Sequence, residues 1–119
     1  MPSDPVTPPV EVRFTPEFKR NLRALSKRYL HIRSDVKPII EQLQVGNFVG
    51  DRIPHTAYTV YKVRIQNRDA QRGKSGGYRL VYYLQTSEHV ILITIYSKTE
   101  QSDISAAELR RIIREFEES

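Results

Sequence analysis

The fold is decided by two β-rich runs in the second half of the 119-residue chain. They read Tyr78-Arg-Leu-Val-Tyr-Tyr-Leu84 and Val90-Ile-Leu-Ile-Thr-Ile-Tyr96, and a short turn around Thr86-Ser-Glu88 separates them. Both runs are rich in β-branched and aromatic residues, which favour strands. The second run is also the longest apolar stretch, yet it is far shorter than the roughly 20 residues that a membrane-spanning helix needs. The sequence therefore predicts two strands joined by a turn.

A third strand, which we take to be the central one, precedes these two. Residues 58–66 alternate apolar with polar side chains, and successive side chains of a strand point to opposite faces. Lys62 and Arg64 therefore share one face, opposite the apolar side chains of Tyr61, Val63 and Ile65. If helices cover the apolar face, both cations stand on the open face of the sheet.

Three helices surround these strands. The first starts at Thr15-Pro16-Glu17, where a hydroxyl N-cap is followed by proline at the first helical position. The second starts at Ser34-Asp35 with Pro38 in its first turn, and Gly46 ends it. The third opens with Ser105-Ala-Ala-Glu108, which has the form of a capping box.

These elements define the expected fold class. A short strand over residues 10–14 comes first, so the order is β-α-α-β-β-β-α. This order predicts an α+β fold: a small, twisted, mostly antiparallel sheet with the two N-terminal helices on one face and a C-terminal helix. Residues 1–9 contain four prolines and are expected to form a disordered tail. Residues 10–119 are expected to form a single domain.

Composition narrows the possible classes of protein. The chain has no cysteine, which excludes disulfides, thiol nucleophiles and cysteine-based metal clusters. Its three histidines show no ligand-like spacing, so we expect neither a metal nor a cofactor. The sequence shows no signal-peptide pattern, and we expect a soluble, cytoplasmic protein with no membrane partner.

The net charge of +5 is unevenly distributed. Residues 13–79 carry 15 basic and 5 acidic side chains, whereas residues 80–119 have a net charge of −3. Between residues 62 and 79 only Asp69 opposes six cations, which are Lys62, Arg64, Arg68, Arg72, Lys74 and Arg79. Such a surface attracts polyanions and suits the charge of a phosphoryl transition state. We therefore expect nucleic acid as substrate or partner.

Three stretches together resemble the RelE/ParE superfamily of toxins. They are Tyr61-Lys-Val-Arg-Ile65, Gly77-Tyr-Arg-Leu-Val-Tyr82 and residues 93–104, and their order and spacing agree over about residues 10–117. The stretch over residues 72–79 is similar to the HigB-type branch. The fold of this family, a small antiparallel sheet with two N-terminal helices and a C-terminal helix, agrees with the predicted one.

The resemblance implies the toxin of a type II toxin–antitoxin system. Toxins of this kind are ribosome-dependent endoribonucleases (mRNA interferases), and an antitoxin encoded beside them holds them inactive. The expected partners are therefore mRNA in the ribosomal A site, the ribosome with its 16S rRNA, and a cognate antitoxin. Such enzymes activate the RNA 2′-hydroxyl to attack the adjacent phosphate without a metal, leaving a cyclic phosphate and a 5′-hydroxyl.

The resemblance also implies roles for four basic residues. Lys62 and Arg64 fall on the two basic positions of the RelE strand, Arg79 on its Gly-Tyr-Arg arginine, and Lys98 on the basic position after the last strand. We assign Arg79 and Arg64 to phosphate stabilisation. Lys62 or Lys98 is assigned to proton transfer or further charge stabilisation.

Other assignments and alternatives complete the hypothesis. RelE has a lysine where Arg64 stands and a catalytic tyrosine where Ser105 stands; we interpret Ser105 as a helix cap and consider Tyr96 a possible substitute. Three loop cations, Arg68, Arg72 and Lys74, are assigned to RNA binding. A ParE-like poison of DNA gyrase, or a non-catalytic RNA- or DNA-binding module, stays open as an alternative function.

Overall fold

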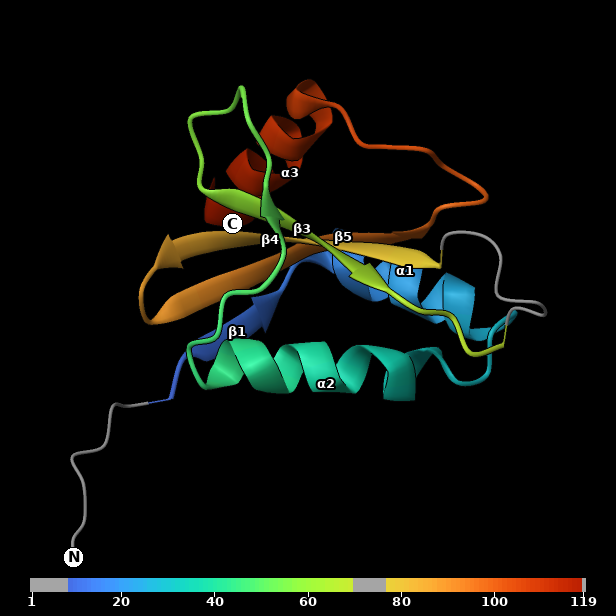
Figure 1. The fold of residues 1–119 in the computed structure, drawn as a ribbon. Helices are drawn as coiled ribbons and strands as arrows, with labels where there is room; N and C mark the ends of the chain where they lie inside the picture. Colours follow the sequence, from blue (N-terminus) through green and yellow to red (C-terminus); the bar gives the residue numbers. More distant parts are fainter. Residues whose placement is uncertain (1–8, 70–76, 119) are drawn as a thin grey trace, which may run out of the picture.

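The computed structural model describes residues 9–69 and 77–118, which form a five-stranded sheet with helices on both faces (Figure 1). The strands are β1 (Glu11–Phe14), β2 (Asp51–Arg52), β3 (Val60–Ile65), β4 (Tyr78–Thr86) and β5 (His89–Ser97). The helices are α1 (Pro16–Ser26), α2 (Ile32–Gln44) and α3 (Ala106–Glu118). The strand order is β1-β5-β4-β3-β2, with β1 parallel to β5 and the other neighbours antiparallel. The predicted α+β fold is confirmed, with β2 as an additional strand.

Strand β5 is buried on both of its faces. Leu92 and Ile95 belong to the core under α1 and α2, whereas Ile91 and Ile93 belong to the core under α3. A strand covered on both sides has no solvent-facing positions, and this explains why residues 90–96 form a nearly continuous apolar run. Strand β4 lies beside it at the centre of the sheet, so β3 is not the central strand that the sequence suggested.

The start of α1 is tied directly to β5. The Thr15 hydroxyl accepts a hydrogen bond from the Phe18 N–H at 2.9 Å and donates one to the Ile93 carbonyl at 2.7 Å. The predicted N-cap at Thr15 is therefore confirmed, and it also fixes where the helix crosses the sheet. Phe18 and Leu25 point from α1 into the core.

Helix α2 begins earlier than the sequence predicts. The Asp35 N–H already donates to the His31 carbonyl at 2.9 Å, so the first helical residue is Ile32 and not Ser34. Pro38 consequently lies inside the helix and not in its first turn, and it cannot donate to the carbonyl four residues before it. Ile32 is fully buried, and we attribute the earlier start to this tertiary packing, which local capping preferences do not include.

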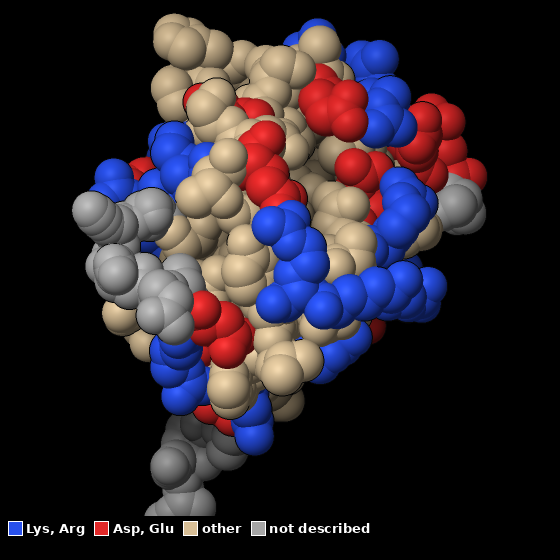
Figure 2. Space-filling model, turned by 90° about the vertical axis from the view of Figure 1, so that its right-hand side faces the viewer, with Lys and Arg blue, Asp and Glu red and all other residues tan. Residues whose placement is uncertain are grey.

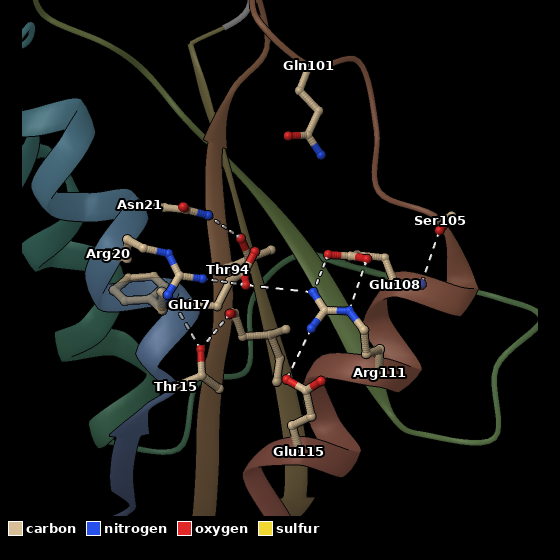
Figure 3. A network of polar contacts seen from close by, with 12 residues as sticks. Thr15, Glu17, Arg20, Asn21, Thr94, Gln101, Ser105, Glu108, Arg111 and Glu115 are labelled. Atoms are coloured by element: carbon tan, nitrogen blue, oxygen red, sulfur yellow. Dashed lines mark hydrogen bonds and ion pairs between the residues drawn. The ribbon is translucent and has the colours of Figure 1, made fainter.

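Helix α3 covers part of the opposite face of the sheet and is also tied to α1. The Ser105 hydroxyl accepts a hydrogen bond from the Glu108 N–H at 3.1 Å, which confirms the predicted cap. The Glu108 carboxylate faces Arg111 at 2.6 Å, and Arg111 also lies 3.8 Å from Glu17 of α1 (Figure 3). Arg111 therefore links the two helices across the edge of β5.

Strand β2 lies between the end of α2 and β3, in a segment for which the sequence predicts no strand. Gly50 precedes it with φ of +107°, a backbone conformation that L side chains rarely adopt. A Cβ at this position would lie 2.7 Å from the Lys62 carbonyl oxygen. Only glycine therefore lets the chain pass close against β3 and place β2 at the edge of the sheet.

We predict that Gly50→Ala destabilises the protein more than Gly46→Ala. Gly46 has φ of +86° but no atom within 4 Å of an added Cβ, so its replacement costs about 1 kcal/mol of backbone strain. Gly50→Ala adds a collision with β3, so we expect a loss of roughly 2–5 kcal/mol. Urea unfolding of the two variants measures both losses, and equal losses would contradict the close approach of β2 to β3.

Candidate active site

A groove of about 410 Å³ opens where β2, β3 and β4 meet the segment that follows β5. Five of its ten lining residues are basic and two are acidic. They are Asp51, Arg52, Ile53, Pro54, Lys62, Arg64, Arg79, Lys98, Asp103 and Ile104. The groove therefore brings together four of the five residues that we expect to be catalytic, which are Lys62, Arg64, Arg79 and Lys98.

The register of the strands places these cations on one face. Arg64 of β3 stands directly opposite Arg79 of β4, so both side chains lie on the same side of the sheet. Val60 lies on this side too, and packs in the core under α3. The sequence predicts that this face of the sheet is open, whereas α3 covers it at the end of β3 that carries Val60. The cations lie at the opposite end of β3, beyond α3.

An acidic residue that the sequence reasoning missed sits among these cations. The Asp103 carboxylate lies 3.2 Å from the Lys62 ammonium and accepts the Ile104 N–H at 2.8 Å. The Ile104 N–H and Lys62 hold the pKa of Asp103 below its usual value, against the effect of partial burial. Lys98 donates to the Ser102 carbonyl at 2.9 Å. These contacts hold residues 98–104 beside the groove. In the sequence, the only signal for Asp103 is its position within the stretch of residues 93–104 that resembles the toxin superfamily.

Two of the predicted catalytic residues are buried. Arg79 is 8% exposed and donates from Nη1 to the Tyr78 carbonyl at 3.2 Å. Tyr96 stands opposite Arg79 in the register and is 5% exposed, and its hydroxyl is buried with no hydrogen-bond partner among the described residues. Burial raises the pKa of Tyr96 to about 12, and the nearby Asp103 carboxylate adds to this shift. Tyr96 thus lies outside the groove lining, and its catalytic role stays a prediction.

Of the three residues assigned to RNA binding, only Arg68 lies in the described part of the chain, and it does not line the groove. Arg68 turns toward α2, where its Nε lies 2.5 Å from Asp35 and its Nη2 lies 3.0 Å from the Ser34 hydroxyl. The Asp35 carboxylate is only 3% exposed, and Arg68 supplies its counter-charge. Arg72 and Lys74 lie outside the described residues.

The surface beside the groove carries charges of both signs. Figure 2 views the right-hand side of Figure 1, toward which the segment after β5 extends. Lys and Arg side chains gather across this side, and Asp and Glu side chains lie among them (Figure 2). Within residues 9–69 and 77–118 there is no group of three His, Cys, Asp or Glu that could hold a metal. No helix in those ranges is long and apolar enough to cross a membrane.

Fold and groove together define a small α+β protein with a cation-lined site that suits a phosphate group. The family model described as "RelE toxin of RelE / RelB toxin-antitoxin system" matches residues 54–116, more than half of the chain. The chain therefore belongs to the RelE toxin family of the RelE/ParE superfamily, which confirms the resemblance seen in the three sequence stretches. Membership implies an antitoxin partner. The matched residues include all four of the predicted catalytic cations that line the groove.

We predict that Lys62→Ala raises the pKa of Asp103 toward its ordinary value of 3.8, because one of the groups that hold it low is removed. Carboxyl ¹³C NMR titration measures this pKa, and Arg110→Ala, an exposed change on α3, is the control. The pKa of Asp103 is lower in the folded protein than in the unfolded chain. The ion pair therefore stabilises the fold at pH values above the unfolded-state pKa, and this stabilisation is lost as the pH falls through the folded-state pKa. An Asp103 pKa that Lys62→Ala leaves unchanged would contradict the ion pair.

Proposed function

We propose that this toxin is a ribosome-dependent endoribonuclease of the HigB-type branch, which cleaves mRNA in the ribosomal A site. The observation that carries the proposal is the convergence of Lys62, Arg64, Arg79 and Lys98 in one groove of a RelE-family chain. Clustered guanidinium and ammonium groups form charge-assisted hydrogen bonds with phosphate oxygens and stabilise the charge that develops on them. Poisoning of DNA gyrase, the alternative function, involves no phosphate chemistry that would need this set.

The proposed reaction uses the 2′-hydroxyl of the RNA as nucleophile. As it loses its proton, its oxygen bonds to the adjacent phosphorus, and the bond from phosphorus to the 5′-oxygen breaks. The products are a 2′,3′-cyclic phosphate and a 5′-hydroxyl, which takes up a proton. The protein therefore has to supply a proton acceptor, a proton donor and stabilisation of the extra negative charge on the phosphorane.

The side chains of the groove divide between these tasks by their chemistry. A guanidinium is a poor proton-transfer group and a good partner for phosphate oxygens, so Arg64 and Arg79 are assigned to stabilising the phosphorane. An amine can both bind and release a proton, which assigns proton transfer to Lys62 or Lys98. Burial of Arg79 strengthens its interaction with the developing charge, because less water screens it.

The proposed partners follow from this reaction. The toxin acts in the cytoplasm on the translating ribosome, next to 16S rRNA. Its antitoxin neutralises it with an acidic or amphipathic segment that covers the basic groove or displaces α3. The basic character of the groove, with five cations against two carboxylates, supports an acidic segment.

We predict that Arg64→Ala lowers mRNA cleavage about 100-fold or more, the usual effect of removing one group that stabilises transition-state charge. Arg64 is exposed, so the fold should survive this change. Cleavage is measured on a defined mRNA in a translating extract, with circular dichroism as the test of folding. Arg110→Ala removes an equal charge from the exposed side of α3 and should cleave like the wild type. Arg79→Ala is a second groove variant with the same expected loss.

Other outcomes would replace the proposal. Full cleavage by both Arg64→Ala and Arg79→Ala would show that this groove is not the active site. Growth arrest without mRNA cleavage, together with loss of DNA supercoiling, would favour the gyrase poison. Nucleic-acid binding with neither effect would favour a non-catalytic binding module.

A further inference from the structure

The groove has a second half whose chemistry the cations do not explain. Ile53 and Pro54, which follow β2, and Ile104, which precedes α3, line it beside the charged residues. Ile53 and Ile104 are half-buried and pack against the core under α3, while Pro54 is exposed. Together these three residues form an apolar shelf that continues directly from the cationic half. Binding of a phosphate group alone does not require an apolar surface beside the cations.

Backbone contacts hold the shelf in place before any ligand binds. The Ile53 N–H donates to the Val60 carbonyl at 2.8 Å, which ties this side of the shelf to β3. Ile104 is held from the other side, because its N–H donates to the Asp103 carboxylate that contacts Lys62. The Lys62–Asp103 ion pair therefore joins the two sides of the shelf. A site arranged in advance loses little conformational entropy on binding.

We propose that the shelf of Ile53, Pro54 and Ile104 receives a nucleobase of the RNA nucleotide whose phosphate the cations bind. This inference rests on the proposed function and names a subsite of the same groove. A nucleotide carries an anionic group and a flat ring with apolar faces, one sugar apart, and the groove offers surfaces for both. Its volume of about 410 Å³ lies within the roughly 300–1,000 Å³ typical of small-molecule sites. Unstacked bases of single-stranded RNA are commonly bound through their ring faces.

Asp51 makes this subsite selective among bases. It stands opposite Lys62 in the register of β2 and β3, so its side chain lies on the groove face of the sheet. Asp51 forms no ion pair with any residue that the structure describes, because Lys62 contacts Asp103 instead. An ionised carboxylate only accepts hydrogen bonds, and the exocyclic amino groups of cytosine, adenine and guanine donate them. Uracil has no amino group, and its one ring donor, N3–H, stands between two carbonyl oxygens that repel a carboxylate, so the subsite disfavours uracil.

A binding experiment tests the shelf without the ribosome. The probes are 3′-CMP, 3′-UMP and inorganic phosphate, added to the full chain with NMR observation of the isoleucine methyl groups. We expect 3′-CMP to shift the Ile53 and Ile104 methyl signals at lower concentration than 3′-UMP, and Asp51→Asn to remove this difference. Phosphate alone should leave these methyl signals in place. If all three probes give the same shifts, the shelf does not bind a base.

A cleavage experiment tests the same subsite in the proposed reaction. Pro54→Ala and Ile104→Ala should lower cleavage in a translating extract about 5- to 10-fold, the lower range for loss of a base-stacking surface. We expect this loss as a higher KM with little change in kcat, because the shelf binds the base and does not touch the phosphate. Asp51→Asn should raise the share of cleavage sites at uracil. Val45→Ala, a change at an 80% exposed residue directly after the C-terminal end of α2, is the control and should cleave like the wild type.

The two experiments separate this inference from the proposed function. Normal cleavage with unchanged base preference in all three groove variants overturns the shelf and leaves the nuclease intact. Absence of cleavage by the wild-type chain, together with methyl shifts that depend on the base, overturns the nuclease and leaves the nucleotide subsite. Pro54 and Asp51 are exposed, so their variants report on binding even if Ile104→Ala weakens the fold.

Discussion

The burial of β5 on both faces is the constraint on which the rest of the structure depends. Helices α1 and α2 cover one side and α3 covers the other, and the Thr15 hydroxyl ties the start of α1 to the Ile93 carbonyl. An unpaired charge is costly to bury, so cations cannot occupy the part of the sheet that the helices cover. The exposed Arg64 therefore lies where β3 and β4 extend beyond α3, and Arg79 stands opposite it, buried but hydrogen-bonded to the Tyr78 carbonyl. The groove forms at this end of the strands.

Charge balance then shapes the groove itself. Five cations in one small site repel one another, and Asp103 offsets part of this repulsion by its ion pair with Lys62. The same contact fastens the segment between β5 and α3 to β3. The remaining excess of positive charge lowers the stability of the folded protein but attracts a polyanion. The same mutual repulsion that destabilises the site therefore accompanies its suitability for phosphate.

Much of the fold follows from local patterns. The two β-rich runs of residues 78–84 and 90–96, the alternation along residues 58–66 and the caps at Thr15 and Ser105 all predict observed elements. The sequence does not predict strand β2, because the strand has only two residues and forms by pairing with β3 and not through the β-propensity of its own residues. The start of α2 was misplaced for a related reason, since Ile32 is drawn into the helix by burial in the core.

The sequence by itself determined the order of the elements, the face that Lys62 and Arg64 share, and the concentration of positive charge before residue 80. A period of two along a strand and the composition of a segment are local properties, so they can be read without a structure. Only the tertiary structure decided which cations meet. Lys98 reaches the groove from beyond β5, whereas Arg68 turns away from it because the buried Asp35 carboxylate requires a counter-charge. Strand register and the free-energy cost of an unpaired buried charge determine which cations line the groove, and both depend on residues far apart in the chain.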